Sequence, residues 1–452
     1  MTRHRVFALL GALVGVVVLV CAAIFTTFGS LGGSGGFWGS DGGPRSDSAA
    51  VRDSDGSRGP SAQARVPVGA AEPASADTWT GTWATAPVGA EQEAPTGYPG
   101  RSIRNVVHLS IGGTSARVTF SNLYSPKALF IGHASVAVHA GGAAAAPGTM
   151  RRLTFAHREN VTVPPGGQVI SDPVRLRVAD NSDLLVSLYT PVPGGPATYH
   201  THAQQTSYFA EGDRTEELGS TAYTEPTTAW RYVTAVDVLN QKAKGTVVAF
   251  GDSITDGVGS TKDKDNRWPD VFARRVAGLQ YGVVNEGIGG NQVLVDAVDT
   301  KNGASGINRF RRDVLDRAGA KTVVIDLGVN DILRGRQTDP SRITAGLKAL
   351  TRQAHARGLR VIGSTLTPFG AHRGYTGVQE SVREQVNAQI RAGGIYDAVV
   401  DFDKALRDPY APTRLRPVYD SGDGLHPSDA GYTAMARTLN LNLLGDRTPA
   451  TL

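Results

Sequence analysis

Residues 247–257 read Val-Val-Ala-Phe-Gly-Asp-Ser-Ile-Thr-Asp-Gly. The apolar start of this stretch predicts a buried strand, because it is too short and too rich in valine for a helix. The glycine-containing turn that follows places Ser253 at the carboxyl end of the strand, where open α/β sheets bind their ligands. A serine there is either a nucleophile with a base in reach or the cap of the next helix, and this stretch alone favours neither.

Strands and helices alternate after Gly245. Besides the strand that leads to Ser253, we expect strands at residues 281–285, 322–327, 360–365 and 398–401, and helices at residues 267–277, 339–354, 378–392 and 428–444. One more helix is expected where Ile307, Phe310, Val314 and Leu315 share a face. Five strands with crossover helices predict a parallel, doubly wound α/β sheet covered on both faces.

A different pattern fills residues 79–238. Short runs of alternating hydrophobicity, at residues 106–111, 116–120 and 184–189, are separated by clusters of glycine and proline. Short strands with frequent turn signals predict an antiparallel β-sandwich. We therefore expect a sandwich domain at residues 77–240 and an α/β domain at residues 245–445. The role of the sandwich stays open between glycan binding, a wall of the active-site cleft and a spacer.

The N-terminus predicts export. Arg3 and Arg5 precede an apolar run from Val6 to Phe28, which is longer than the core of an ordinary signal peptide and long enough to span a bilayer. Residues 1–28 are therefore expected to be a signal peptide or a membrane anchor, with the rest of the chain outside. Residues 29–76, rich in Gly, Ser and Pro, are expected to form a disordered linker. The single cysteine, Cys21, lies in the apolar run, so the exported part can form no disulfide.

The formal net charge of +5 does not come from a basic block. The densest cluster, Arg309, Arg311 and Arg312, falls on one expected helix. Because no aromatic residues interleave with it, we expect a solvated helix face here and no nucleic-acid partner.

Four segments after Phe250 carry side chains suited to acyl transfer. Ser253 follows the first strand, Gly290 follows the second, Asn330 follows the third, and Asp423 with His426 precede the last helix. Acyl transfer needs a nucleophile, a base, a group that orients the base and donors for an oxyanion. Three residues separate Asp423 from His426 in a tight turn, so the carboxylate can reach the imidazole. Each residue alone is also consistent with a structural role, as a cap, a turn or a surface histidine, but together they favour catalysis.

On these residues, the chain from about Gly245 to Leu444 resembles the SGNH/GDSL hydrolases, a family of esterases and lipases. The matching blocks are Gly251-Asp252-Ser253, Gly290, Asn330 in Gly-x-Asn-Asp, and Asp423-x-x-His426. The resemblance implies a flavodoxin-like fold and a Ser253–His426–Asp423 triad. It also implies an oxyanion hole made by the N–H groups of Ser253 and Gly290 and the side chain of Asn330.

Residues 266–269 and 285–290 are similar to a branch of that family with acetylxylan-esterase-like members, and the jelly-roll-like sandwich resembles a domain placed before some carbohydrate acetylesterases. The expected function is therefore an exported serine esterase acting on short-acyl esters, such as acetyl esters, of carbohydrate. Two alternatives stay open. One is a lipase or lysophospholipase acting on long acyl chains, and the other is a non-catalytic glycan-binding protein.

The sequence lacks the motifs that are typical of other enzyme classes. The α/β-hydrolase motif Gly-x-Ser-x-Gly is absent because Thr255 follows Ser253 by two residues, and residues 287–292 lack the third glycine of a dinucleotide loop, so no cofactor is expected. His200 and His202 share one face of a strand, but no third metal ligand is evident. We expect no metal and favour a structural or surface role for this pair, with the rim of the catalytic cleft as a further option.

Overall fold

The computed structural model describes residues 79–298 and 301–444, which lie within one compact unit of the chain, Gly69–Leu452. The expected apolar segment at residues 1–28 and the expected linker at residues 29–76 fall outside the described residues. None of the helices in the two described ranges is both long enough and apolar enough to cross a membrane.

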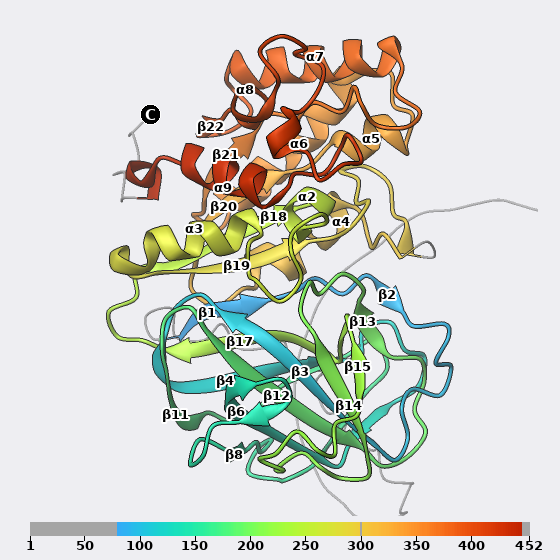
Figure 1. The fold of residues 1–452 in the computed structure, drawn as a ribbon, viewed down its shortest axis with the longest axis vertical. Coiled ribbons are helices and arrows are strands. Elements are labelled where there is room, and N and C mark those ends of the chain that lie inside the picture. Colours follow the sequence, from blue (N-terminus) through green and yellow to red (C-terminus); the bar gives the residue numbers. More distant parts are fainter. Residues whose placement is uncertain (1–78, 299–300, 445–452) are drawn as a thin grey trace, which may run out of the picture. The chain divides into compact units, whose positions relative to one another are not determined.

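Antiparallel strands form the first part of the described chain, as predicted (Figure 1). One large sheet contains, in spatial order, β1 (Trp79–Ala84), β17 (Val233–Leu239), β4 (Gly113–Ser121) and β10 (Gln168–Ile170), with β11 (Val174–Val178) also paired to β4. The other contains β15 (Glu225–Thr227), β14 (Ser207–Glu211), β3 (Arg101–Leu109), β12 (Ser182–Thr190), β6 (His133–Gly141) and β7 (Ala144–Ala145), with β8 (Arg151–Arg152) paired to β6. Smaller sheets join β16 (Trp230–Arg231), β13 (Thr198–His200) and β2 (Gly89–Ala90), and β5 (Leu129–Ile131) with β9 (Val161–Val163).

The two large sheets share one apolar core. Every second residue points into it, as Val118 and Phe120 do in β4 and Leu184, Val186 and Leu188 do in β12. This alternation is typical of a sandwich whose inner faces pack together. Some of these strands, such as β4 and β12, extend beyond the alternating runs that the sequence shows. The residues at their ends are polar or glycine, so hydrophobic alternation does not mark them as strand.

The second part is a five-stranded parallel sheet, also as predicted. Its spatial order is β19 (Tyr281–Gly287), β18 (Gly245–Gly251), β20 (Ala320–Asp326), β21 (Arg360–Ser364) and β22 (Ala398–Val400). Numbered along the chain this order is 2-1-3-4-5, the flavodoxin-like form of a doubly wound sheet. Gly251 at the end of β18 pairs with Gly287 of β19 and Asp326 of β20, so the carboxyl ends of three strands meet there.

Helices cover both faces of this sheet (Figure 1). Val247 and Ala249 pack on the side of α3 (Trp268–Val276), α8 (Phe402–Leu406) and α9 (Asp429–Thr438). Val248 and Phe250 pack on the side of α4 (Gly306–Phe310), α5 (Val329–Leu333), α6 (Pro340–His355) and α7 (Gly377–Arg391). Successive residues of β18 thus face opposite layers, and all of them are buried.

The last helix is shorter than predicted. The backbone of Leu439 is extended, which ends α9 at Thr438, and only a short 3₁₀ turn at Leu441–Leu444 follows. Arg275 of α3 donates a hydrogen bond to Leu439 O at 3.0 Å, so a side chain satisfies a carbonyl group that a continued helix would have paired. The sequence pattern could not predict this end, because the partner comes from another helix.

Candidate active site

Ser253 opens a single-turn helix, α2 (Ser253–Asp256), directly after β18. The Asp252 side chain caps this helix by accepting a hydrogen bond from Ile254 N at 3.0 Å, and Gly257 ends it in the left-handed conformation with a φ of 103°. An added Cβ at Gly251 would lie 2.5 Å from the carbonyl oxygen of Asp326, so the turn into α2 requires glycine. This tight turn presents Ser253 at the carboxyl end of the sheet.

His426 and Asp423 lie in the loop before α9, and they meet Ser253. His426 Nε2 is 2.8 Å from Ser253 Oγ, and His426 Nδ1 is 2.6 Å from Asp423 Oδ2. A carboxylate can only accept, so Nδ1 carries the proton and Nε2 is left as an acceptor for the serine hydroxyl. The three side chains form one continuous hydrogen-bonded chain from the carboxylate to the serine oxygen.

Backbone groups of the same loop hold Asp423 in place. Its Oδ1 accepts hydrogen bonds from His426 N at 2.8 Å and Leu425 N at 2.9 Å. Partial burial opposes ionisation of this carboxyl, but the hydrogen bonds from the His426 side chain and from the backbone hold the pKa of Asp423 well below its usual range. Asp423 is therefore a carboxylate at every pH at which the protein would work.

Gly290 lies in the loop after β19, where its backbone has a φ of +73°. An added Cβ would collide with the side chain of Asn302 and would lie 3.0 Å from Arg334 Cζ, so both conformation and space require glycine here. No hydrogen bond is found from the N–H of Gly290 to an acceptor within the described ranges.

Asn330, the second residue of α5, is 3% exposed, and its Nδ2 donates to Asp252 Oδ2 at 3.2 Å. This hydrogen bond fixes the amide next to the serine turn and leaves its second N–H available. Burial, together with the charge of the nearby Asp326, raises the pKa of Asp252 well above its usual range.

The prediction of a solvated face is wrong for Arg309. The residue is 1% exposed, whereas Arg311 of the same cluster is exposed, as expected. The Arg309 guanidinium donates to Gly251 O at 2.8 Å, to Glu286 O at 2.8 Å and to Asn291 Oδ1 at 3.0 Å. It therefore joins the end of β18, the end of β19 and the loop that contains Gly290. The sequence offered no signal for this burial, because Arg309 lies outside the stripe formed by Ile307, Phe310 and Val314.

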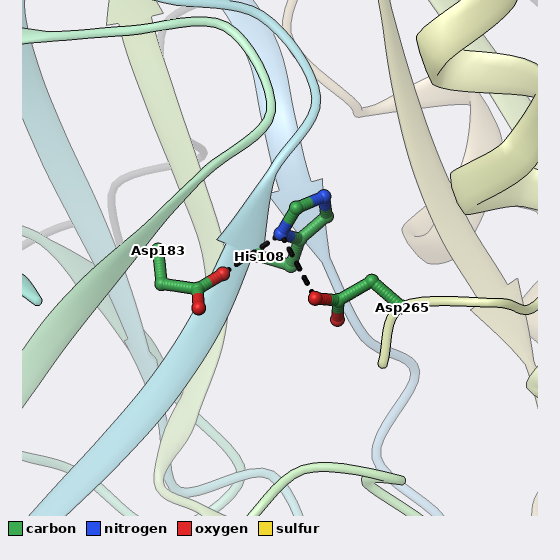
Figure 2. Close-up of side chains that lie close together, drawn as sticks. All are labelled: His108, Asp183 and Asp265. Carbon is green, nitrogen blue, oxygen red and sulfur yellow. Dashed lines mark hydrogen bonds and ion pairs between the residues drawn. The ribbon is translucent and has the colours of Figure 1, made fainter. Parts of the chain in front are cut away.

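Three side chains where the sandwich meets the segment before α3 are the group best suited to hold a metal ion. One ligand atom from each of His108, Asp183 and Asp265 lies within 4.8 Å of the others (Figure 2). His108 Nδ1 is 2.7 Å from Asp183 Oδ1 and 3.3 Å from Asp265 Oδ2. Burial opposes the charged form of His108, but the hydrogen bond to Asp183 and the charge of Asp265 raise its pKa. Both carboxylates lie at Nδ1, and Nε2 has no hydrogen-bond partner among the described residues, so Nδ1–H facing two carboxylates accounts for this arrangement. None of the three residues belongs to the Ser253 site.

The histidine pair of the sandwich is not arranged as metal ligands. His200 is 2% exposed, and its ring nitrogens lie 2.8 Å from Ala86 O and 2.9 Å from Asp256 Oδ1. His202 is half exposed, and an added Cβ at Gly289 would lie 3.1 Å from its Nδ1. Both histidines thus lie beside the elements that carry Ser253 and Gly290, which agrees with the option of a position at the rim of the site.

Several solved structures are similar to the second part of the chain. A protein assigned to the G-D-S-L lipolytic family from Desulfitobacterium hafniense DCB-2 is 25% identical, with 43% of this chain and 99% of that chain covered and a TM-score of 0.34. A carbohydrate acetylesterase from Sinorhizobium meliloti is 19% identical, with 43% and 95% covered and a TM-score of 0.35. An aryl esterase from M. smegmatis is 19% identical, with 43% and 95% covered and a TM-score of 0.36.

A comparison with the curated proteins gave no match. A family model does match, over residues 249–434, and it describes the GDSL-like lipase/acylhydrolase family. The matched residues begin in β18 and end in α9, so they include Ser253, Gly290, Asn330, Asp423 and His426. Over residues 249–434 the chain is therefore similar to the GDSL-like lipase/acylhydrolase family, and this match supports a carboxylic ester hydrolase.

Proposed function

We propose that the protein is an exported serine esterase that removes short acyl groups, such as acetyl, from carbohydrate. The observation that carries the proposal is the chain of two short hydrogen bonds, 2.8 Å from Ser253 Oγ to His426 Nε2 and 2.6 Å from His426 Nδ1 to Asp423 Oδ2. A nucleophile, a base and an orienting acid in contact with one another are the requirement for acyl transfer through an acyl-enzyme.

In the first half of the reaction, Ser253 Oγ attacks the ester carbonyl carbon while its proton passes to His426 Nε2. The imidazolium is stabilised by the Asp423 carboxylate on its other nitrogen. The former carbonyl oxygen becomes negatively charged. It accepts hydrogen bonds from the N–H groups of Ser253 and Gly290 and from the Asn330 amide, which stabilise this charge. When the tetrahedral intermediate collapses, the bond to the alcohol oxygen breaks, and His426 returns the proton to that oxygen.

In the second half, water attacks the acyl-enzyme at the same carbon. His426 takes a proton from the water and returns it to Ser253 Oγ as the acid leaves. The net reaction consumes one water and yields one alcohol and one carboxylic acid. No cofactor is required for either half.

The character of the surroundings supports a small, polar substrate. The side chains next to the glycines of the 285–291 loop are Asn302, Arg334 and His202, which are all polar. A lipase active on long acyl chains would need a contiguous apolar surface near the serine. The exposed large hydrophobic side chains among the described residues come from separate segments: Val192, Leu218, Val295, Val378, Tyr410 and Val418.

Export is part of the proposal and rests on the sequence. Arg3 and Arg5 before the apolar run from Val6 to Phe28 favour passage of the following chain across the membrane. Detecting the mature protein outside the cytoplasmic membrane, with an N-terminus at or after residue 28 if the run is a cleaved signal, tests this point. Retention of the full-length chain in the cytoplasm would contradict it.

The decisive experiment measures hydrolysis of nitrophenyl esters with two to sixteen acyl carbons by the chain from Asp77 onward. Ser253→Ala is the control, and its kcat should fall by at least ~10⁴-fold without a change in the unfolding midpoint. A serine-dependent rate confined to acetyl and butyryl esters supports the proposal, and release of acetate from acetylated xylan then tests the carbohydrate part. A rate that rises with acyl length would favour a lipase or lysophospholipase. No rate above the Ser253→Ala variant, and no labelling of Ser253 by an organophosphonate, would favour a non-catalytic glycan-binding protein.

A further inference from the structure

A buried ion pair joins the sandwich to the helix that carries Ser253. His200 ends β13 in the sandwich, and Asp256 ends α2. The His200 side chain is 2% exposed and the Asp256 side chain is 3% exposed, and His200 Nε2 lies 2.9 Å from Asp256 Oδ1. This contact connects two segments that the family comparison does not join, because the matched residues begin at 249.

The partners of His200 fix its charge. Its Nδ1 lies 2.8 Å from the carbonyl oxygen of Ala86, and a carbonyl can only accept, so Nδ1 carries a proton. Its Nε2 faces a carboxylate, so Nε2 carries a proton as well when Asp256 is ionised. In that state His200 is an imidazolium that faces the Asp256 carboxylate. Burial opposes this form, but the charge and hydrogen bond of Asp256 and the hydrogen bond to Ala86 O outweigh burial and raise the pKa of His200.

The second oxygen of Asp256 holds the loop that contains Gly290. Asp256 Oδ2 accepts a hydrogen bond from Gly289 N at 3.1 Å. The carbonyl oxygen of Gly289 accepts from Asn302 Nδ2 at 2.6 Å. The Gly289 carbonyl and the Gly290 N–H belong to one planar peptide, so the bond from Asn302 sets the direction in which the Gly290 N–H points. The bond to Asp256 fixes the preceding Ile288–Gly289 peptide and so anchors the nitrogen end of Gly289.

Glycine makes this support necessary. Residues 289 and 290 are both glycine, so no side chain of their own restricts the backbone, and the loop would otherwise sample many conformations. A donor that points at the oxyanion in only a fraction of the molecules stabilises the transition state in only that fraction. The proper direction must therefore be imposed by groups outside the loop, by Asn302 directly and by Asp256 through its anchor on Gly289.

We propose that His200 is a positioning residue that the sandwich contributes to the active site: it holds Asp256, and Asp256 anchors Gly289 through its N–H, at the start of the peptide whose Gly290 N–H faces the reacting ester. The proposal rests on the function proposed above. It gives the sandwich a part in catalysis without any contact between His200 and the substrate.

The test compares His200→Leu, which removes both donors, with His200→Gln, in which an amide can still donate to Asp256. The kcat on nitrophenyl acetate should fall about 10- to 100-fold in His200→Leu, because displacement of a catalytic group by about 1 Å has effects of that size. KM should stay within about twofold of the wild type. His200→Gln should recover much of the loss, which a merely space-filling role for His200 would not predict.

His108→Leu is the matched control. His108 is a mostly buried histidine of the sandwich that pairs with a carboxylate outside it, Asp265, and among the described residues no hydrogen bond or ion pair joins it to the 285–291 loop. Its kcat should remain within about twofold of the wild type even if its unfolding midpoint falls as far as that of His200→Leu. An equal loss of kcat in both variants, or a kcat within twofold of the wild type in His200→Leu, would overturn the proposal.

Hydrogen exchange gives a readout that does not need turnover. The amide of Gly289 should exchange faster in His200→Leu than in the wild type, and no faster in His108→Leu. Unchanged exchange in a peptide covering residues 285–292 of His200→Leu would overturn the positioning role even if kcat fell. Faster exchange in a protein that shows no Ser253-dependent hydrolysis would sink the proposed function while leaving the contact in place.

If His200→Leu does not fold, Asp256 provides the second route. Asp256→Asn keeps an acceptor for Gly289 N–H and can pair with neutral His200, so its kcat should remain within about fivefold of the wild type. Asp256→Ala keeps neither and should lose kcat as His200→Leu is expected to, about 10- to 100-fold. Equal activity in the two Asp256 variants would overturn the proposal.

Discussion

Replacing Arg309 by lysine tests whether this buried side chain holds the ends of β18 and β19 and the loop that contains Gly290. The guanidinium makes four hydrogen bonds, to Gly251 O at 2.8 Å, Glu286 O at 2.8 Å, Asn291 Oδ1 at 3.0 Å and Asp313 Oδ2 at 3.1 Å. All of these partners surround a side chain with no exposed surface. A lysine ammonium has three donors at one point and cannot span the same acceptors.

The expected loss of stability follows from the acceptors left behind. Lysine can keep the ion pair with Asp313 and one further acceptor, and Gly251 O keeps the hydrogen bond from Ile288 N at 3.1 Å, so one or two buried acceptors lose their donor. Each unpaired buried group costs about 1–3 kcal/mol, which gives a decrease of about 1–6 kcal/mol in the free energy of unfolding. A decrease of that size is a large part of the roughly 5–15 kcal/mol that holds a typical domain folded.

Urea unfolding, followed by tryptophan fluorescence, measures the change for Arg309→Lys. Arg311→Lys is the matched control, because Arg311 lies two residues away and its side chain is 75% exposed. The control should stay within about 0.5 kcal/mol of the wild type. We also expect a lower kcat in Arg309→Lys, since Gly251 directly precedes the Asp-Ser turn and Asn291 directly follows Gly290. A change in stability no larger than that of the control would refute the reasoning.

Three further predictions concern the triad, the oxyanion loop and the pH dependence of stability. His426→Ala should lower kcat more than Asp423→Asn, because the first loses the base and the second only its orientation; equal losses in folded variants would contradict separate roles. Gly290→Ala should lower kcat about 10²-fold, since its φ of +73° and its crowded surroundings displace the N–H donor, and a kcat within threefold of the wild type would argue against that donor. Two neighbouring aspartates raise the pKa of His108 in the folded protein above its value in the unfolded chain, although burial acts in the opposite direction. The ion pair therefore stabilises the folded state fully at a pH below the unfolded pKa, and this stabilisation is lost as pH rises through the folded pKa. The difference in unfolding midpoint between the wild type and His108→Gln should therefore shrink as pH rises above the usual histidine pKa of about 6.5, and a constant difference would count against this ion pair.

The parallel sheet could be predicted from the sequence because its strands are buried on both faces. In β18, seven consecutive residues from Gly245 to Gly251 are buried, and an apolar run without alternation, here residues 247–250, is typical of a central strand in a parallel sheet. The candidate site residues could be found for a related reason. They directly follow or precede predicted elements, so their place at one edge of the sheet follows from the topology alone.

Contacts between distant segments could not be predicted in the same way. Arg309 has the charge of a surface residue, and only its partners at Gly251 and Glu286 explain its burial. His200 and Asp256 are separated by 56 positions, and their pairing depends on how the sandwich packs against the sheet. Hydrophobic periodicity describes which face of an element is buried, but it does not identify the polar groups of other segments that this face contacts.

The edge of the parallel sheet explains why the sandwich packs where it does. β19 is the first strand in the order of the sheet, so one of its edges has no partner strand in that sheet. An exposed strand edge can form hydrogen bonds with the strands of other chains. Val283 N of β19 donates to Ser110 Oγ of the sandwich at 2.9 Å, and Gly282 has no side chain where its backbone meets Gly81 O of β1. A simple spacer would need neither the hydrogen bond nor the close approach. Because the same packing also brings His200 to Asp256, these contacts favour a wall of the active site over a spacer among the roles that the sequence left open.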